Sequence, residues 1–345
     1  MRVRICCLVL SIVFLRCGAL AQGPKEMTLR PLELGHNLVD TKMPLEGSFG
    51  PIECDDSGAI YARFVNGSAD NTFHIPITKI ARDGTTTTIG IPSVMGQKGM
   101  YLFMFAVSPG GEVYEVLRTS DVGGKPDAEI PTYLQVFSKT GDLRSNSRFD
   151  FNFYPNMLVP LQNDSVFIGG LKLSVEDNKI VRTPLMGIFS SEGQLTRQLT
   201  TAHASVTEDQ RLKGLVNPAL QNGTARMGGD GNIYILLANM PAKVEVVSQA
   251  GEAVREFTLQ PPFENAHAMD MLVSARGILV TYNGPKTSTH DHWAYVVYDN
   301  ETGAPVTAFA PKFFGAPSCW DGSSIVVLEA EKNATSYKIG TAAVP

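Results

Sequence analysis

The chain has 345 residues, 43% of them hydrophobic and 18% charged, a composition that excludes a disordered polymer and favours a globular protein with a large core. Its formal net charge of −5 at pH 7 argues against nucleic acid and anionic lipid surfaces as partners. The 32 glycines and 21 prolines separate apolar runs along the chain, a pattern typical of β-rich proteins with many turns.

Segment 1–21 has the pattern of a cleavable signal peptide. Arg2 and Arg4 precede an apolar run over 5–15, which is too short to cross a bilayer as a helix. Ala19-Leu20-Ala21 fits a cleavage site, so we expect the mature chain to begin at Gln22; the alternative is an uncleaved anchor. The segment carries three arginines and no acidic residue, so its removal takes the net charge from −5 to −8.

No later segment is long and apolar enough to span a membrane. We therefore expect a protein that is secreted or periplasmic, without stable membrane insertion, and monomeric.

The remaining chain, 22–345, is predicted to be one domain of repeated units. Each unit has a turn followed by a pair of apolar or aromatic residues, most clearly in SGAIYARF, GGEVYEVL and DGNIYILL. The pairs recur at steps of 45 to 67 residues and begin at Ile60, Val113, Val166, Ile233, Ile278 and Ile325. A second motif, a short β-rich run before a polar turn with glycine, alternates with the first. Its glycines are Gly84, Gly141, Gly193, Gly251 and Gly303.

Two hairpins in each unit make about four antiparallel strands, the composition of a propeller blade. Such blades bury their faces only against neighbours, and closing them into a ring removes the two unpaired ends. The last unit ends in ATSYKIG, one strand short of a second hairpin, and residues 27–34 form a spare strand. The sequence therefore predicts an all-β, six-bladed β-propeller in which the N-terminal strand, 27–34, completes the last blade.

The longest step contains an insertion at about 200–222, between the third and fourth blades. Ser205 with Glu208, or Thr207 with Gln210, has the spacing of a capping box and predicts a short helix that ends near Gly214. An irregular surface loop is the alternative interpretation.

Two cysteines, Cys54 and Cys319, remain after removal of the leader. Each lies six residues before the apolar pair of its unit, so both are expected at one register position on the innermost strands of the first and last blades. These blades are neighbours in a closed ring, and a disulfide there would fasten the closure. The alternative is two buried thiols that act as small apolar side chains.

The turn followed by Ile-Tyr, in DSGAIY, PGGEVY and GDGNIY, together with the VFSKTG-like hairpin, resembles the six-bladed propellers of the NHL-repeat type over nearly all of 22–345. Such units usually carry an aspartate three residues after the aromatic residue. This chain has other residues there, namely Phe64, Leu117, Gly170, Leu237, Tyr282 and Glu329. The resemblance therefore implies a divergent relative and transfers no function.

The chain contains no common hydrolase, nucleotide-binding or zinc motif. His290 and His292 lie two apart, so on a strand both could reach one divalent metal, although two ligands alone make no closed site. The alternative is a solvent-exposed loop.

Polar residues just before or on the innermost strands are candidates for a ligand site at the mouth of the central channel: Tyr154, Asn156, Asn217, Arg226, His267 and Asp270. A carboxylate, an imidazole and a guanidinium gathered there could polarise a substrate or hold a metal. Each could instead cap a loop by hydrogen bonding.

Two functions remain open. The first is a non-catalytic binding or scaffold module for a protein, a glycan or a small ligand. The second, which rests on fold analogy, is a metal-dependent lyase or lactonase with its site at the channel mouth.

Overall fold

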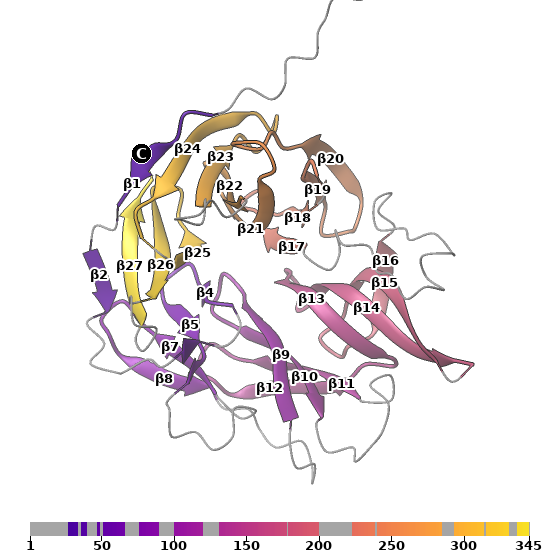
Figure 1. Cartoon of the computed structure of the whole chain (residues 1–345). Helices are drawn as coiled ribbons and strands as arrows, with labels where there is room; N and C mark the ends of the chain where they lie inside the picture. The colour runs from indigo at the N-terminus through magenta and orange to yellow at the C-terminus, as the bar shows by residue number, and fades with distance from the viewer. Residues whose placement is uncertain are drawn as a thin grey trace, which may run out of the picture.

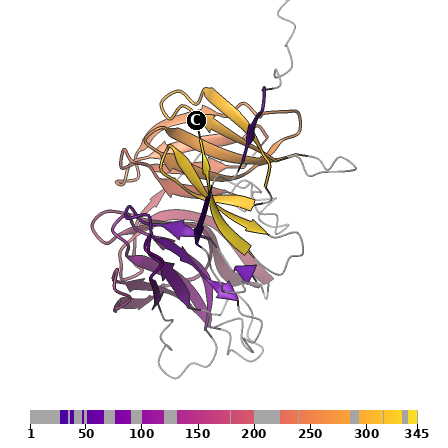
Figure 2. The same ribbon diagram turned by 90° about the vertical axis from the view of Figure 1, so that its left-hand side faces the viewer.

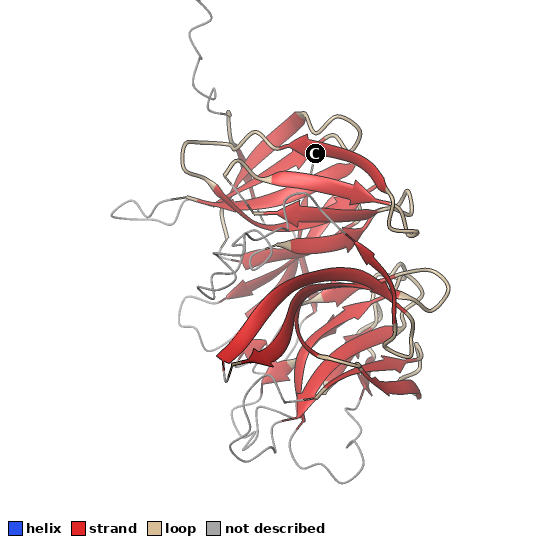
Figure 3. Cartoon of the chain, turned by 90° about the vertical axis from the view of Figure 1, so that its right-hand side faces the viewer, coloured by secondary structure: helices blue, strands red, loops and turns tan. Residues whose placement is uncertain are grey.

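The computed structural model describes residues 27–33, 36–39, 47–48, 51–65, 76–89, 100–119, 131–177, 179–199, 223–238, 240–284, 293–313, 315–330 and 337–344. These ranges contain strands and loops and no helix, as Figure 3 shows, and thus no helix that could cross a membrane. Six sheets stand around a common centre (Figure 1). The protein is a six-bladed β-propeller, as the repeats predict. The expected signal peptide and the 200–222 insertion lie outside the described ranges.

The blades are numbered 1 to 6 in chain order, and their strands run from the centre outward. Blade 1 contains β4 (Glu53–Cys54), β5 (Ile60–Ala62), β7 (Ile77–Ile80) and β8 (Thr86–Ile89). Blade 2 contains β9 (Met100–Val107), β10 (Val113–Thr119), β11 (Thr132–Phe137) and β12 (Leu143–Arg148). Blade 3 contains β13 (Asn152–Pro160), β14 (Val166–Glu176), β15 (Lys179–Phe189) and β16 (Leu195–Leu199).

Blade 4 contains β17 (Thr224–Met227), β18 (Ile233–Leu237), β19 (Lys243–Val247) and β20 (Ala253–Thr258). Blade 5 contains β21 (His267–Ser274), β22 (Gly277–Asn283), β23 (Trp293–Tyr298) and β24 (Pro305–Pro311). Blade 6 contains β25 (Gly315–Trp320), β26 (Ser324–Ala330) and β27 (Tyr337–Ala343), followed by β2 (His36–Val39). The short strands β3 (Gly47–Ser48) and β6 (Phe64–Val65) pair separately.

The repeated sequence pattern reflects burial on both faces of each blade. The second strand of blade 4, IYILL, is buried at every position, because its alternate side chains pack against blades 3 and 5. The five glycines predicted to form tight hairpin turns all have positive φ, between 68° and 90°. Glycine adopts this backbone conformation without the steric cost that a Cβ would add.

Apolar clusters fill the interfaces between neighbouring blades. The interface between blades 4 and 5 has 16 buried members, whereas that between blades 6 and 1 has five: Ile52, Ile60, Ala62, Ile80 and Ile339. Among the described residues, the closing interface is therefore the least filled by apolar side chains.

The N-terminal segment closes the ring, although not with the predicted residues. Strand β2 pairs antiparallel with β27 and is the fourth strand of blade 6. The predicted closing segment, 27–34, instead contains β1 (Arg30–Leu32), which adds in parallel to β24 as a fifth strand of blade 5. Leu32 is buried in the cluster between blades 5 and 6, and this packing explains why β1 lies on blade 5. Figure 2 shows one indigo strand beside the orange strands of blade 5 and the other beside the yellow strands of blade 6.

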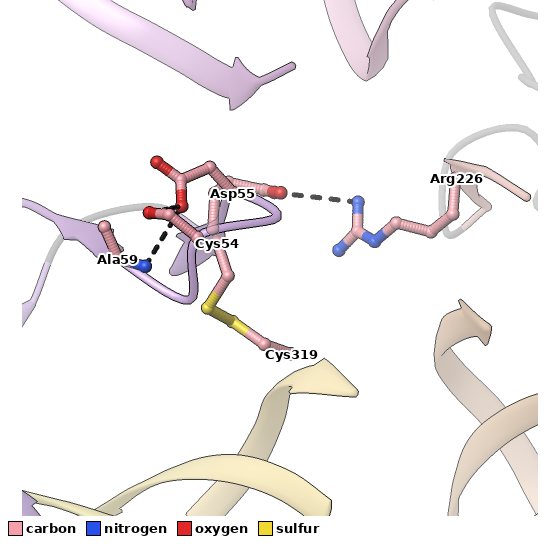
Figure 4. The surroundings of a disulfide bond; sticks show 7 residues. Cys54, Asp55, Ala59, Arg226 and Cys319 are labelled. Atoms are coloured by element: carbon pink, nitrogen blue, oxygen red, sulfur yellow. Dashed lines mark hydrogen bonds and ion pairs between the residues drawn. A yellow bond between two sulfur atoms is a disulfide. The ribbon is translucent and has the colours of Figure 1, made fainter. Parts of the chain in front are cut away.

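A disulfide between Cys54 and Cys319 also joins the first and last blades, with Cα atoms 6.0 Å apart and 265 residues between them in sequence (Figure 4). The expectation that both occupy one register position is wrong. Cys54 pairs with Ile60, but Cys319 pairs with Val326, because the turn of blade 6 is one residue shorter and Trp320 takes the position opposite Ile325.

Replacing both cysteines, as C54A/C319A, is expected to lower the free energy of unfolding by about 3 to 5 kcal/mol, since the bridge closes a very long loop. Urea denaturation of the mature protein with and without reductant measures the change, and reduced wild type should match the double variant. Thiol titration of the denatured, unreduced protein is the direct check. Two free thiols per mature chain would contradict the disulfide.

Candidate functional site

A cavity of about 620 Å³ lies at the centre of the ring. The innermost strands of all six blades line it, through Glu53, Val107, Val159, Arg226, Leu272 and Cys319 among others. It extends outward between blades 1 and 6, where Ile60, Ile80, Val326 and Thr341 form its walls. The cavity therefore lies along the least filled interface, beside the disulfide.

Three charged side chains from three different blades meet in this centre. Arg226 lies in blade 4, and its Nη1 is 3.8 Å from Oε1 of Glu53 in blade 1, across the ring. Its Nη2 is 3.6 Å from Oδ1 of Asp270 in blade 5. The side chains of Glu53, Arg226 and Asp270 are 14%, 23% and 35% exposed, so the cluster is half-buried. Glu53 and Arg226 line the cavity, whereas Asp270 is not among its lining residues. Figure 4 shows Arg226 extending from its strand toward the turn after Cys54.

Local strand geometry positions these three side chains. Glu53 pairs with Tyr61 and Arg226 pairs with Tyr234, so both occupy the same register position of their blades, one residue before an apolar position. Asp270 follows a β-bulge in β21, where the register shifts between Ala268 and Asp270. A bulge changes the direction of nearby side chains.

Burial raises the pKa of Glu53 to about 7, although Arg226 partly offsets this effect and Asp270 adds to it. Burial lowers the pKa of Arg226, but Glu53 and Asp270 more than compensate and hold it above its usual value. Arg226 is therefore a permanent cation, whereas Glu53 exchanges a proton near neutral pH.

The turn aspartates at the edge of the cavity have structural roles. Asp55 accepts hydrogen bonds from the Ala59 amide at 3.0 Å, from the Tyr61 hydroxyl at 2.8 Å and from Ser57. Burial raises the pKa of Asp55, but these hydrogen bonds and Lys79 outweigh it and keep the pKa below its usual range. Asp55 is thus an ionised carboxylate whose oxygens hold the turn; Figure 4 shows its bond to Ala59.

The structure brings together two of the predicted channel-mouth residues, Arg226 and Asp270. Tyr154 and Asn156 belong to β13; Tyr154 is 44% exposed, and the guanidinium of Arg118 lies 5.8 Å from its ring centroid. His267 begins β21 and is exposed. None of these three is among the residues that line the cavity.

The other predicted residues, Asn217, His290 and His292, lie outside the described ranges. Within those ranges, no three His, Cys, Asp or Glu side chains gather closely enough to hold a metal ion.

Sequence analysis missed Glu53. The repeat alignment contains the pattern that identifies it. Glu53 lies directly before Cys54, and Arg226 lies directly before Met227, which occupies the same alignment position as Cys54. Two opposite charges at one register position, in the first and fourth of six units, face each other across a ring.

A second buried polar cluster lies between blades 1 and 2, away from the cavity. Glu115 and Gln135 are fully buried, directly opposite each other on β10 and β11. Neither side chain has a hydrogen-bond partner among the described residues, and the charged neighbour of Glu115 is Arg63. Burial raises the pKa of Glu115 to about 8, partly offset by Arg63, so this acid is mostly protonated at neutral pH.

No family model and no curated protein match the chain, so the NHL-repeat type is not confirmed. The structure is similar to a protein of unknown function from Dyadobacter fermentans, with a TM-score of 0.52 and 9% identity over 91% of this chain and 99% of that one. A protein of unknown function from Bacteroides caccae has a TM-score of 0.48 and 12% identity over 79% and 86% of the two chains. A polysaccharide lyase, an ulvan lyase, has a TM-score of 0.42 and 12% identity over 84% and 77%. At these identities the likeness shows the fold alone, and the last two carry no further argument.

Replacing Glu115 with glutamine is expected to flatten the pH dependence of stability. Folded Glu115 keeps its proton up to about pH 8, whereas the unfolded residue loses it near the ordinary glutamate pKa of 4.5. The unfolded state binds fewer protons between these two pH values, so wild type loses stability as pH rises. Between pH 5 and 9, Glu115→Gln should therefore gain on the order of 4 kcal/mol of stability relative to wild type.

Urea denaturation across this pH range measures the gain, with the exposed Glu192→Gln as the matched control. An equal pH dependence in wild type and Glu115→Gln would show that Glu115 is not protonated in the folded protein.

Proposed function

We propose that the protein is an exported binding module that holds a small polar ligand in the central cavity of its propeller. The observation that carries the proposal is that residues from all six blades enclose one cavity, and that Glu53 and Arg226, two members of a charge cluster that joins three blades, line it. A volume of about 620 Å³ lies within the usual range for small-molecule sites. Apolar walls with a few convergent polar groups are also typical of such sites.

Export is part of this proposal. It rests on the signal-peptide pattern of 1–21 and on the disulfide, which suits an oxidising compartment. The ligand is a free small molecule or the end of a glycan or peptide, and nucleic acid is disfavoured by the acidic net charge. The divergent NHL-type assignment and the monomeric state belong to the same proposal.

No observation in the described part of the chain favours the alternative of a metal-dependent lyase or lactonase. That hypothesis rests on fold analogy, and two of its candidate metal ligands, His290 and His292, lie outside the described ranges. Metal analysis of the purified mature protein tests it independently of ligand binding.

Filling the cavity should abolish binding. Met227 lines the cavity and is half-buried, so Met227→Trp places an indole in the space that a ligand would occupy. Leu143→Trp, on the exposed edge strand of blade 2, is the matched control. In a thermal-shift screen of sugars, amino acids and short peptides, a ligand that stabilises wild type and Leu143→Trp should not stabilise Met227→Trp.

Calorimetry on each hit confirms the loss, with an expected weakening of at least about tenfold, or 1.4 kcal/mol. Equal binding to wild type and Met227→Trp would place the site elsewhere and overturn the proposal.

A further inference from the structure

The central cluster contains one more negative charge than positive charge. Glu53 and Asp270 share the single guanidinium of Arg226. When both carboxylates are ionised, the group carries a net charge of −1. Protonation of Glu53 near neutral pH removes this excess in the unliganded protein.

The rest of the lining makes the cavity more acidic. Asp55, Asp56 and Asp321 also line it, whereas the other cations described there are Arg82 in the lining and Lys79, whose ammonium lies 3.5 Å from Asp55. Hydrogen bonds within their turns keep the pKa values of Asp55 and Asp321 low, so both remain ionised. A cavity lined mainly by negative charge attracts cations and repels anions.

The contacts of Arg226 are loose enough to rearrange. Distances of 3.6 and 3.8 Å to the two carboxylates exceed those of good charged hydrogen bonds. The one hydrogen bond described for its guanidinium goes to its own neighbour, the Ala225 carbonyl, at 3.3 Å. Asp270 can remain paired with Arg226 while Glu53 pairs with another cation. The carboxylate of Glu53 can therefore bind a cationic group of a ligand.

The cavity also offers unused hydrogen-bond donors. Arg226 has donors without a described acceptor, and Trp320, which lines the cavity, is 9% exposed. The Trp320 indole Nε1–H, by contrast, is buried without contact with the cavity space and has no partner among the described residues, so it is not counted among these donors. Apolar walls such as Leu158 and Val159 suit the C–H surface of a ring. These features match a ligand that combines a cation, hydroxyl groups and an apolar surface.

We infer that the cavity binds a hydroxylated primary amine of the amino-sugar class, whose ammonium pairs with Glu53 while Asp270 retains Arg226. This inference rests on the proposed function, because it identifies the ligand class of the same cavity. The ammonium supplies the positive charge that the cluster lacks, and the hydroxyl groups accept hydrogen bonds from Arg226.

Proton release follows from this arrangement. The ligand replaces the proton of Glu53, so binding near pH 6 releases about one proton, since Glu53 is then mostly protonated. The other charged residues that line the cavity with Glu53 are Arg226, Asp55, Asp56, Asp321 and Arg82. Asp270 lies behind them against Arg226, and Lys79 pairs with Asp55. Affinity should rise about tenfold between pH 5.5 and 7 as Glu53 ionises.

The test is isothermal titration of the mature protein with glucosamine and galactosamine, each compared with its neutral counterpart, glucose and galactose. The amino sugars should bind at least about tenfold more tightly than the neutral sugars. Titrations in two buffers of different ionisation enthalpy measure the released proton. Glu53→Gln should reduce amino-sugar affinity at least about tenfold and abolish proton release, whereas the exposed Glu192→Gln should change neither.

Asp270→Asn is the second variant. This substitution removes the carboxylate that pairs with Arg226, so Arg226 competes with the ligand ammonium for Glu53. Amino-sugar binding should weaken although the carboxyl of Glu53 is still present.

Three outcomes would overturn the inference and leave the proposed function standing. One is equal affinity for glucose and glucosamine, and another is unchanged amino-sugar affinity in Glu53→Gln. The third is failure of every amino sugar while a different ligand binds wild type but not Met227→Trp. If no ligand of any class is sensitive to Met227→Trp, the proposed function fails as well.

Discussion

The structure depends on closing a ring of sheets that cannot bury their faces alone. Each blade packs its two faces against its neighbours, so an open array would expose two apolar faces and lose cooperativity. Closure occurs between blades 6 and 1, where the N-terminal β2 pairs with β27 and a disulfide joins the innermost strands. These two devices act at opposite edges of the same blade, one on its outermost strand and one at the centre. Together they act where the described residues form the smallest apolar cluster between blades.

This way of closing also explains where the cavity lies. Well-filled interfaces leave no space, as between blades 4 and 5, where tyrosines, methionine and branched aliphatic side chains pack closely. At the closing interface, hydrogen bonds and a covalent bond replace part of that packing. Space can therefore remain between Ile80 and Val326 without opening the ring. The disulfide forms part of the cavity wall, so the element that stabilises the closure also shapes the site.

The repeated elements of this fold could be predicted from the sequence, whereas single events could not. Because one turn-strand pattern occurs six times, an ambiguous copy can be interpreted by comparison with the clearer ones. The blade count, the strand number and the five hairpin glycines were therefore predicted correctly. The N-terminal segment occurs once, and two short apolar stretches, 27–34 and 36–39, compete for one edge. Packing of Leu32 between blades decides between them, and no local pattern reports such packing. Likewise, the turn of blade 6 is one residue shorter than that of blade 1, so Cys319 and Cys54 pair at different register positions of their blades.

The central charges show that ring closure brings residues far apart in the sequence into contact. Arg226 would be costly in the middle of a protein without carboxylates near it, because burying an unpaired charge is strongly unfavourable. Among the described residues, the carboxylates near it come from blades 1 and 5. Two carboxylates around one guanidinium leave one negative charge in excess. Burial raises the pKa of Glu53, so a bound proton neutralises this excess charge. Glu53 holds its proton below about pH 7 and releases it above, so near neutral pH it can exchange that proton for another cation at little free-energy cost. For this reason we place the proposed ligand site at the centre of the ring rather than on its outer edge strands.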